Sequence, residues 1–370
     1  MYATLYGQRS EVEPEETHFH RAPNGIWHLK KASLLENEIM DAFERLNLKC
    51  IQLLFDSADQ FWDTIETSNF DVIHAGIDPE ALCSRDEFAD ELHKIKNPLE
   101  HKLIYYYSVR HYNHVAQNIL KHILISLGDA YALLSEPNLH EDVPLLVQAH
   151  GEGEIFRNTI SPSGHRIWTN ISFCTEKTVS FLDFMTKYVF ELSQINLGAV
   201  PNKPKARNET FRSWSKIKLA EGTALSEWSD ELRLIHALRD ETVHNGTIDH
   251  HAKIYEHAIG SAVQRRFILL PDHEKGRFLT SAGRKRFYRQ DNHLNVVLPS
   301  ILETVFRDAL SSLNEIDRGI GDQWDNPNSY FERHSDFHAA IQSAEDMGAF
   351  IKSSNSGKQS HLAQSFNKKN

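Results

Sequence analysis

The sequence predicts a mainly α-helical protein, and two patterns in it lead to this prediction. Apolar residues recur three or four positions apart over long stretches of the chain, which places them along one side of a helix. Proline, glycine and asparagine gather in the gaps between these stretches, where they end or interrupt helices. We therefore expect a helical bundle in the second half of the chain, preceded by an N-terminal helical region.

In the first half, Ser33 and Glu36 form a Ser-x-x-Glu capping box, so we expect a helix to begin there. A turn-rich gap at residues 67–85 separates this helix from a second helical region over residues 86–134. Residues 136–165 contain several Pro and Gly residues and read as a connection. We expect a domain boundary in this connection.

In the second half, helical spacing predicts helices over residues 166–195, 225–244 and 297–316. The middle one is followed by Asn245 and Gly246, residue types that adopt the left-handed conformation at helix ends. These helices form the core of the expected bundle.

The remaining segments are harder to interpret. Residues 267–270 and 277–280 are compatible with a short β-hairpin, and residues 330–351 with a weaker helix. The last residues, 353–370, are rich in Ser, Asn, Gln and Lys and read as a disordered tail. The expected organisation is a helical region of unknown role (1–150), a helical domain (151–325), and the weak helix with its tail (326–370).

The composition excludes some classes of protein. The 370 residues carry a net charge of −11, which disfavours a protein that coats nucleic acid but allows one local basic groove. No apolar run reaches the length of a membrane span, and three widely spaced cysteines argue against a disulfide scaffold. We therefore expect no membrane association and a cytoplasmic location.

The most informative motif is the stretch Leu238–Gly246, which contains Arg239, Asp240 and His244 at the end of the helix predicted over 225–244. Arginine binds and neutralises phosphate oxygens, and histidine transfers protons near neutral pH. Five positions along a regular helix place Arg239 and His244 about 140° apart around its axis. Three arrangements can bring them together: a frayed helix end, a long reach by Arg239, or a dimer in which two such helices meet.

The electrostatic setting of His244 leaves its charge open. The negative end of the helix dipole favours the protonated imidazole, whereas Arg239 opposes it. Asp240 can orient either side chain by hydrogen bonding.

This stretch resembles the signature of HEPN domains, in which an arginine and a polar residue are followed a few positions later by histidine. HEPN domains are helical and include RNA-cleaving members of toxin, anti-phage defence and CRISPR systems. The resemblance covers roughly residues 160–320, and its specific part is the motif. It implies that Arg239 stabilises charge on a phosphate, while His244 removes the proton of the ribose 2′-OH or protonates the leaving oxygen.

The resemblance also implies a metal-independent endoribonuclease that leaves 2′,3′-cyclic phosphate ends and needs no cofactor. The implied partners are RNA, a second copy of the chain bound through the motif helix, and an antitoxin or other regulatory protein. The alternative is a non-catalytic helical interaction module in which Arg239 and His244 are structural.

One segment is basic despite the acidic total. Its cations are Arg265, Arg266, Lys275, Arg277, Arg284, Lys285, Arg286 and Arg289. Phe278, Phe287 and Tyr288 lie among them, and cations with interleaved rings are typical of single-stranded RNA binding. The alternative is a solvated surface loop with a few core aromatics.

Other motifs give less information about function. No His-Glu-x-x-His, paired-cysteine, phosphate-loop or Gly-x-Ser-x-Gly pattern occurs, so we expect no metal site, ATP hydrolysis or serine hydrolysis. Arg110 and His114 form a similar pair in the first half, one residue too close for the signature. The tyrosines around them indicate packing.

Overall fold

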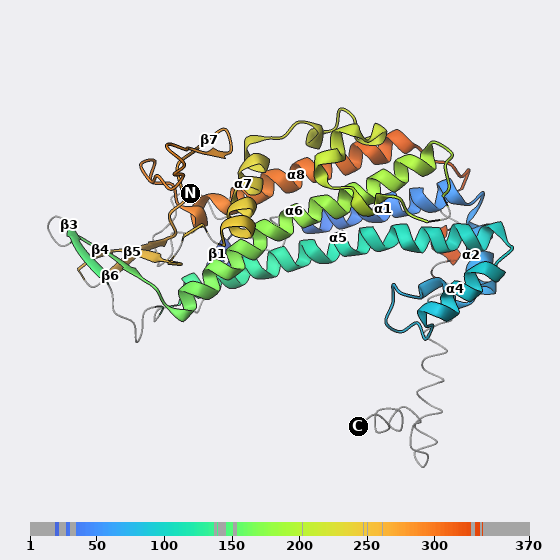
Figure 1. Ribbon diagram of the computed structural model, residues 1–370, viewed down its shortest axis with the longest axis horizontal. Helices are drawn as coiled ribbons and strands as arrows, with labels where there is room; N and C mark the ends of the chain where they lie inside the picture. Colours follow the sequence, from blue (N-terminus) through green and yellow to red (C-terminus); the bar gives the residue numbers. More distant parts are fainter. Residues whose placement is uncertain are drawn as a thin grey trace, which may run out of the picture.

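The protein is mainly α-helical, as the sequence predicts. In the computed structural model the helices form an elongated bundle, with a β-sheet at one end and short helices at the other (Figure 1). The structure describes residues 19–21, 27–29, 35–136, 139, 146–150, 154–201, 203–246, 248–249, 251–260, 262–326, 330–333 and 335. The tail expected over 353–370 and most of the helix expected over 330–351 lie outside these residues.

Two long helices, α5 (Pro98–Leu134) and α6 (Pro162–Asn196), pack side by side along the bundle (Figure 1). Each begins with proline in its first turn, where no backbone donor is needed. The side chains of Asn97 and Ser161 cap the two starts by accepting from backbone N–H groups. The helices expected over 86–134 and 166–195 are therefore present, and the first is divided by the break before Pro98.

Helices α1 (Glu36–Leu54), α7 (Asp230–Asn245) and α8 (Leu294–Ile320) complete the bundle. The ring of Phe181 in α6 meets Phe43 of α1 at 6.2 Å and Phe306 of α8 at 5.8 Å between centroids. One buried cluster runs from α1 through α8. The boundary expected in residues 136–165 therefore does not separate two hydrophobic cores.

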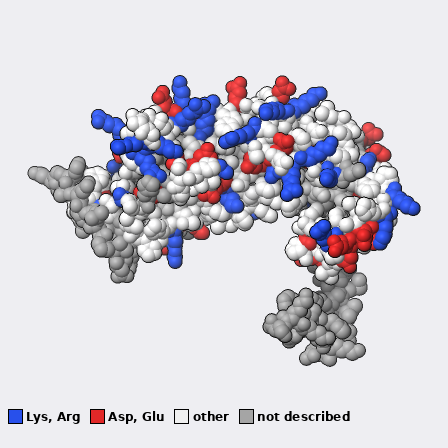
Figure 2. Space-filling model, viewed as in Figure 1, with Lys and Arg blue, Asp and Glu red and all other residues white. Residues whose placement is uncertain are grey.

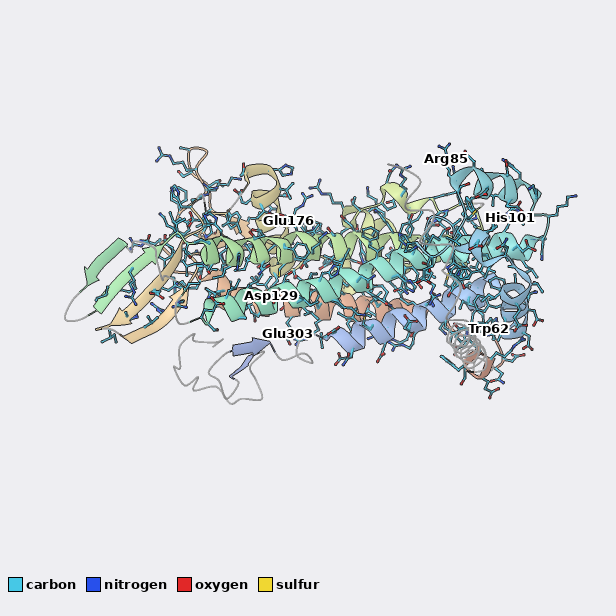
Figure 3. The ribbon with its side chains drawn as sticks, turned by 90° about the horizontal axis from the view of Figure 1, so that it is seen from below. Trp62, Arg85, His101, Asp129, Glu176 and Glu303 are labelled. Atoms are coloured by element: carbon cyan, nitrogen blue, oxygen red, sulfur yellow. The ribbon has the colours of Figure 1, made fainter. Side chains whose placement is uncertain are left out.

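Short helices α2 (Ala58–Thr67), α3 (Phe70–His74) and α4 (Arg85–Lys94) cover one end of the bundle. Figure 3 shows Trp62 and His101 at this end, while Asp129 and Glu176 lie towards the end that carries the sheet. Helix α1 begins at Glu36, with Leu35 in a left-handed conformation and no side-chain cap. Ser33 of the expected capping box lies outside the described residues.

Between α6 and α7 the chain forms four short 3₁₀ helices, η3 (Ala206–Asn208), η4 (Phe211–Lys216), η5 (Lys218–Ala220) and η6 (Ala224–Ser226). A buried carboxylate fixes the entry to this segment. Glu191 accepts hydrogen bonds from Tyr105 Oη and from the backbone N–H groups of Lys205 and Ala206. Because the carboxylate is fully buried, these donors offset its desolvation.

A four-stranded antiparallel sheet has the order β3 (Leu146–His150), β4 (Glu154–Thr159), β5 (Ile254–Ile259) and β6 (Ala262–Phe267). Strands β3, β4 and β5 were not predicted from the sequence. Two-stranded pairs are formed by β1 (Phe19–Arg21) with β2 (Trp27–Leu29), and by β7 (His273–Glu274) with β8 (Arg277–Phe278). The expected hairpin over 267–280 is thus reduced to β7 and β8, because residues 268–270 bond to residues 292–294. Among the described helices, none is both long and apolar enough to cross a membrane.

Candidate functional site on helix α7

Helix α7 carries the motif, and local signals fix both of its ends. Ser229 caps the start by accepting from the backbone N–H of Leu232 at 3.3 Å. Asp230 and Glu231 occupy the first turn, where negative charge is favoured by the helix dipole. Gly246 ends the helix with a left-handed φ of 81°. The expected stop at Asn245–Gly246 is confirmed.

Arg239 and Asp240 form an ion pair on the surface of this helix. Arg239 Nη1 donates to Asp240 Oδ1 at 2.9 Å, and the two side chains are 34% and 45% exposed. Exposed pairs of this kind contribute about 0–1 kcal/mol to folding, so stability is a weak reason for the contact. Its geometric consequence is that the carboxylate holds the guanidinium at a defined place.

His244 is exposed in the last turn of α7. The helix stays regular through Asn245, so His244 lies about 140° around the axis from Arg239. Of the three arrangements, the frayed end requires the helix to stop at Val243, whereas α7 continues to Asn245. Within the described part of a single chain, Arg239 and His244 are not in contact, and the dimer arrangement remains a prediction.

A second histidine, His236, shares the Arg239 side of the helix. It lies one turn before Arg239 and stacks on Trp228, with ring centroids 4.4 Å apart. Burial lowers the pKa of His236 to about 4, and nearby Arg212 and Arg239 act in the same direction. His236 lies outside the Arg-to-His spacing and was not predicted as a site residue, although its position three residues before Arg239 is a signal that the sequence contains.

Helix α6 contributes Asp183 to the same side of α7. Its Oδ1 accepts from the backbone N–H of Phe211 at 2.7 Å. Burial raises the pKa of the Asp183 carboxyl, while this hydrogen bond and the positive charges of Lys187 and Arg239 act against the shift. This side of α7 is therefore a half-buried patch of carboxylate, guanidinium and imidazole.

The other side of α7 is flanked by residues 271–290, which we call the basic loop. Asp272, 4% exposed, holds its two ends together. The Asp272 carboxylate accepts from the backbone N–H groups of Arg289 and Gln290, both at 2.8 Å. The Asp272 backbone accepts from Leu279 and donates to Phe287. One buried residue thus gives the loop a defined shape.

The basic loop contacts α7 at two places. At Gly276, φ is +71°, and a Cβ atom would lie 2.1 Å from the backbone oxygen of Asp230, so glycine is required for this approach. Near the motif, Lys285 Nζ forms an ion pair with Glu241. An open cleft of 560 Å³ lies between the two elements, lined by Arg233, Glu274, Lys275, Arg277, Phe278, Leu279 and Thr280.

The expected RNA-binding residues lie in four different settings in the structure. Arg266 is 2% exposed and forms an ion pair with buried Glu256 at 2.5 Å, so the prediction that Arg266 binds RNA is wrong. Arg265 lies on the sheet, over the ring of Phe267. Exposed cations of the loop are Lys275, Arg277, Arg284 and Arg289, whereas Lys285 and Arg286 are half-buried. Figure 2 shows Lys and Arg gathered over the region of α7 and β7.

The site therefore combines an exposed imidazole, a guanidinium held by a carboxylate, and cations along one flank. Among the described residues, no group of three or more His, Cys, Asp or Glu side chains is placed to hold a metal ion. No protein-family model, curated protein or solved structure matches this chain. The interpretation of the site accordingly depends on its own residues.

Proposed function

We propose that the protein is a metal-independent endoribonuclease of the HEPN type, with its active site at the C-terminal half of α7. One observation carries the proposal. Exposed His244 lies on the same helix as the Arg239–Asp240 pair, and the Lys285–Glu241 contact places the basic loop along that helix. His244 and the cations of the basic loop thereby lie along one side of α7, while Arg239 lies on a different side of the same helix.

The proposed reaction is a transesterification within the RNA strand. The ribose 2′-oxygen attacks the adjacent phosphorus, the bond to the 5′-oxygen breaks, and the products are a 2′,3′-cyclic phosphate and a 5′-hydroxyl. His244 removes the proton of the 2′-OH or protonates the leaving oxygen. Arg239 stabilises the negative charge that develops on the phosphate oxygens, and Asp240 orients Arg239.

The basic loop is the proposed path of the RNA strand. Its exposed Arg277, Arg284 and Arg289 suit phosphate binding. The rings of Phe287 and Tyr288, 38% and 37% exposed, suit base stacking. A single strand fits this surface better than a duplex, because stacking on side chains requires unpaired bases.

We further propose that two copies of the chain form the complete site. The separation of about 140° keeps Arg239 and His244 of one chain on different sides of α7. A second copy packed against this helix would supply the missing group from across the interface. Val243, beside His244 and 46% exposed, offers an apolar contact for such packing.

Cleavage of mixed single-stranded and structured RNA in excess EDTA tests the activity. We expect cyclic phosphate ends from the intact protein and loss of cleavage in His244→Ala. His251→Ala is the matched control, since His251 is also an exposed histidine near the end of α7. Cleavage that survives in His244→Ala, or that requires a metal ion, contradicts the assignment. A folded dimer that cleaves no RNA favours the non-catalytic module.

Mixing two inactive variants tests the composite site. If Arg239 of one chain acts with His244 of the other, a mixture of Arg239→Ala and His244→Ala chains regains activity, because one site in each mixed dimer is intact. If both groups come from one chain, the mixture stays inactive. Refolding each variant alone is the control.

A further inference from the structure

A second cavity lies away from α7, between α1, α5 and residues 330–331. Its volume is 460 Å³, within the range of small-molecule sites. It is lined by Asp41, Glu44, Arg45, Asn47, Leu48, Arg110, Tyr330 and Phe331. Tyr330 also stacks on Trp62, which places this cavity towards the end of the bundle marked by Trp62 in Figure 3.

The α5 wall of this cavity presents a donor that the protein does not satisfy. Arg110 Nε is buried and has no hydrogen-bond partner, and the described residues provide no ion pair to this guanidinium. Arg110 lies over the ring of Tyr107, 5.9 Å from its centroid. Burial and the charge of Arg110 lower the pKa of nearby His114 to about 4, so Arg110 is the cation of this wall at neutral pH. A ligand that offers an acceptor to Arg110 relieves the cost of its burial.

The α1 wall presents acceptors. Asn47 is 4% exposed, and its Oδ1 is buried without a partner among the described residues. Glu44, one turn earlier, accepts from Gln117 Nε2 at 3.0 Å and is itself exposed at the cavity. Asp41 lies one further turn back on the same side of α1. Arg45, the cation of this wall, is paired with Asp317 at 3.0 Å, so the wall suits a ligand edge with more than one N–H donor.

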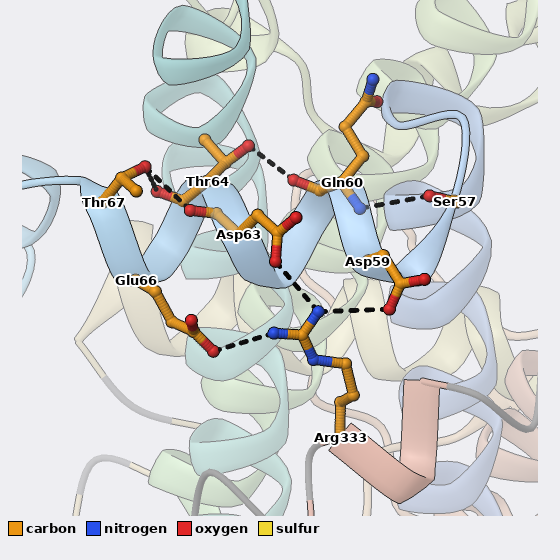
Figure 4. A network of polar contacts seen from close by, with 8 residues as sticks. All are labelled: Ser57, Asp59, Gln60, Asp63, Thr64, Glu66, Thr67 and Arg333. Carbon is orange, nitrogen blue, oxygen red and sulfur yellow. Dashed lines mark hydrogen bonds and ion pairs between the residues drawn. The ribbon is translucent and has the colours of Figure 1, made fainter.

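The third wall is aromatic and is held in place by charge. Tyr330 stacks on Trp62 with ring centroids 5.5 Å apart, and Phe331 is 57% exposed. Two residues further, Arg333 forms ion pairs with Asp59, Asp63 and Glu66 along α2, at 3.1, 3.0 and 3.0 Å (Figure 4). These contacts fix the turn that carries the rings, so the wall is preorganised for a flat ligand.

We propose that this cavity binds a guanine base. Guanine presents acceptors O6 and N7 on one edge, which an arginine fork recognises, and donors N1–H and N2–H₂ next to them. The Arg110 guanidinium meets the acceptor edge, and the exposed carboxylate of Glu44 meets both donors. Adenine lacks the second donor group and places a bare nitrogen opposite the carboxylates. The proposal is independent of the activity proposed for α7.

Titration calorimetry with guanosine and adenosine tests the proposal on the full chain. We expect saturable guanosine binding and affinity for adenosine at least about 10-fold weaker. Arg110→Met should weaken guanosine binding about 10-fold or more. Phe331→Ala should also weaken it, and this exposed ring can be removed without disturbing the core. Arg318→Met, an exposed arginine of α8, is the matched control and should bind normally.

Three results overturn the proposal: no saturation by guanosine up to about 1 mM, equal affinity for both nucleosides, or guanosine binding unchanged in Arg110→Met. Inorganic phosphate or a free amino acid that binds in place of guanosine also contradicts it. Thermal unfolding of each variant shows whether the fold is intact. RNA cleavage by Arg110→Met should be unchanged, which separates this site from α7.

Discussion

Replacement of Arg266 by methionine tests whether this arginine, expected from the sequence to bind RNA, instead stabilises the fold. Arg266 is buried at the base of the sheet, where its Nε donates to Glu256 Oε1 at 2.5 Å and its Nη1 to the backbone oxygens of Leu134 and Glu136. Arg266 therefore joins β6 to β5 and to the end of α5. We expect Arg266→Met to destabilise the fold without weakening RNA binding by the folded protein.

The expected loss of folding stability depends on which partners Glu256 keeps after the substitution. Breaking a buried ion pair by removing one partner costs about 3–5 kcal/mol. Glu256 keeps a second partner, Arg157, whose Nε lies 2.7 Å from Glu256 Oε2. The carboxylate is thus not left without a charge partner, and we expect the lower end of the range, about 3 kcal/mol.

Equilibrium urea unfolding, read from the shift of the midpoint at constant slope, measures this loss. Arg284→Met is the matched control, because Arg284 is exposed on the basic loop. It should change stability by less than about 0.5 kcal/mol and should weaken RNA binding. The reasoning is refuted if Arg266→Met costs less than about 1 kcal/mol and weakens RNA binding as much as Arg284→Met does.

Two further predictions concern the setting of α7. Gly276→Ala should cost at least about 2 kcal/mol of folding stability, because its Cβ would meet the α7 backbone. Gly283→Ala, with φ of +75° and open space around it, should cost about 1 kcal/mol. Urea midpoints compare the two variants, and equal losses would contradict the close contact of the basic loop with α7. Because the pKa of His236 is lowered from 6.5 to about 4, its stabilising effect is complete above pH 6.5 and is lost as pH falls towards 4. Unfolding at pH 7 and near pH 4 should therefore show a smaller acid loss in His236→Phe, and an unchanged loss would refute this role.

The long helices were predictable because each carries its own signal. Buried apolar residues along α8, such as Val305 and Leu313, recur at helical spacing in the sequence. Gly246 marks the end of α7 in the same local way. Such features depend on neighbours a few residues apart, so reading the chain in short windows finds them.

The four-stranded sheet was harder to predict from short windows of the sequence. Strand β5 shows an alternating burial pattern from Ile254 to Ala258, which period-two reading of the sequence could have found. Strands β3 and β4 lie in a segment whose glycines indicated a connection, and the pairing of β4 with β5 joins segments about a hundred residues apart. Long-range pairing of this kind leaves little local signal.

The candidate site was also predictable only in part from local sequence. Arg239, Asp240 and His244 stand out by spacing alone, but whether they meet depends on the direction of each side chain around α7. Arg266 looked like an RNA-binding residue because its partner, Glu256, reaches it only through strand pairing. Charge in a sequence window therefore identifies candidates, and burial decides which of them face solvent.

The rate of RNA cleavage in excess EDTA, compared between the intact protein and His244→Ala, tests the central claim most directly. The proposed proton transfer by His244 predicts a loss of at least about 100-fold, with cyclic phosphate ends on the products of the intact protein. Equal rates for the two proteins, both shown to be folded, would contradict an active site at the end of α7.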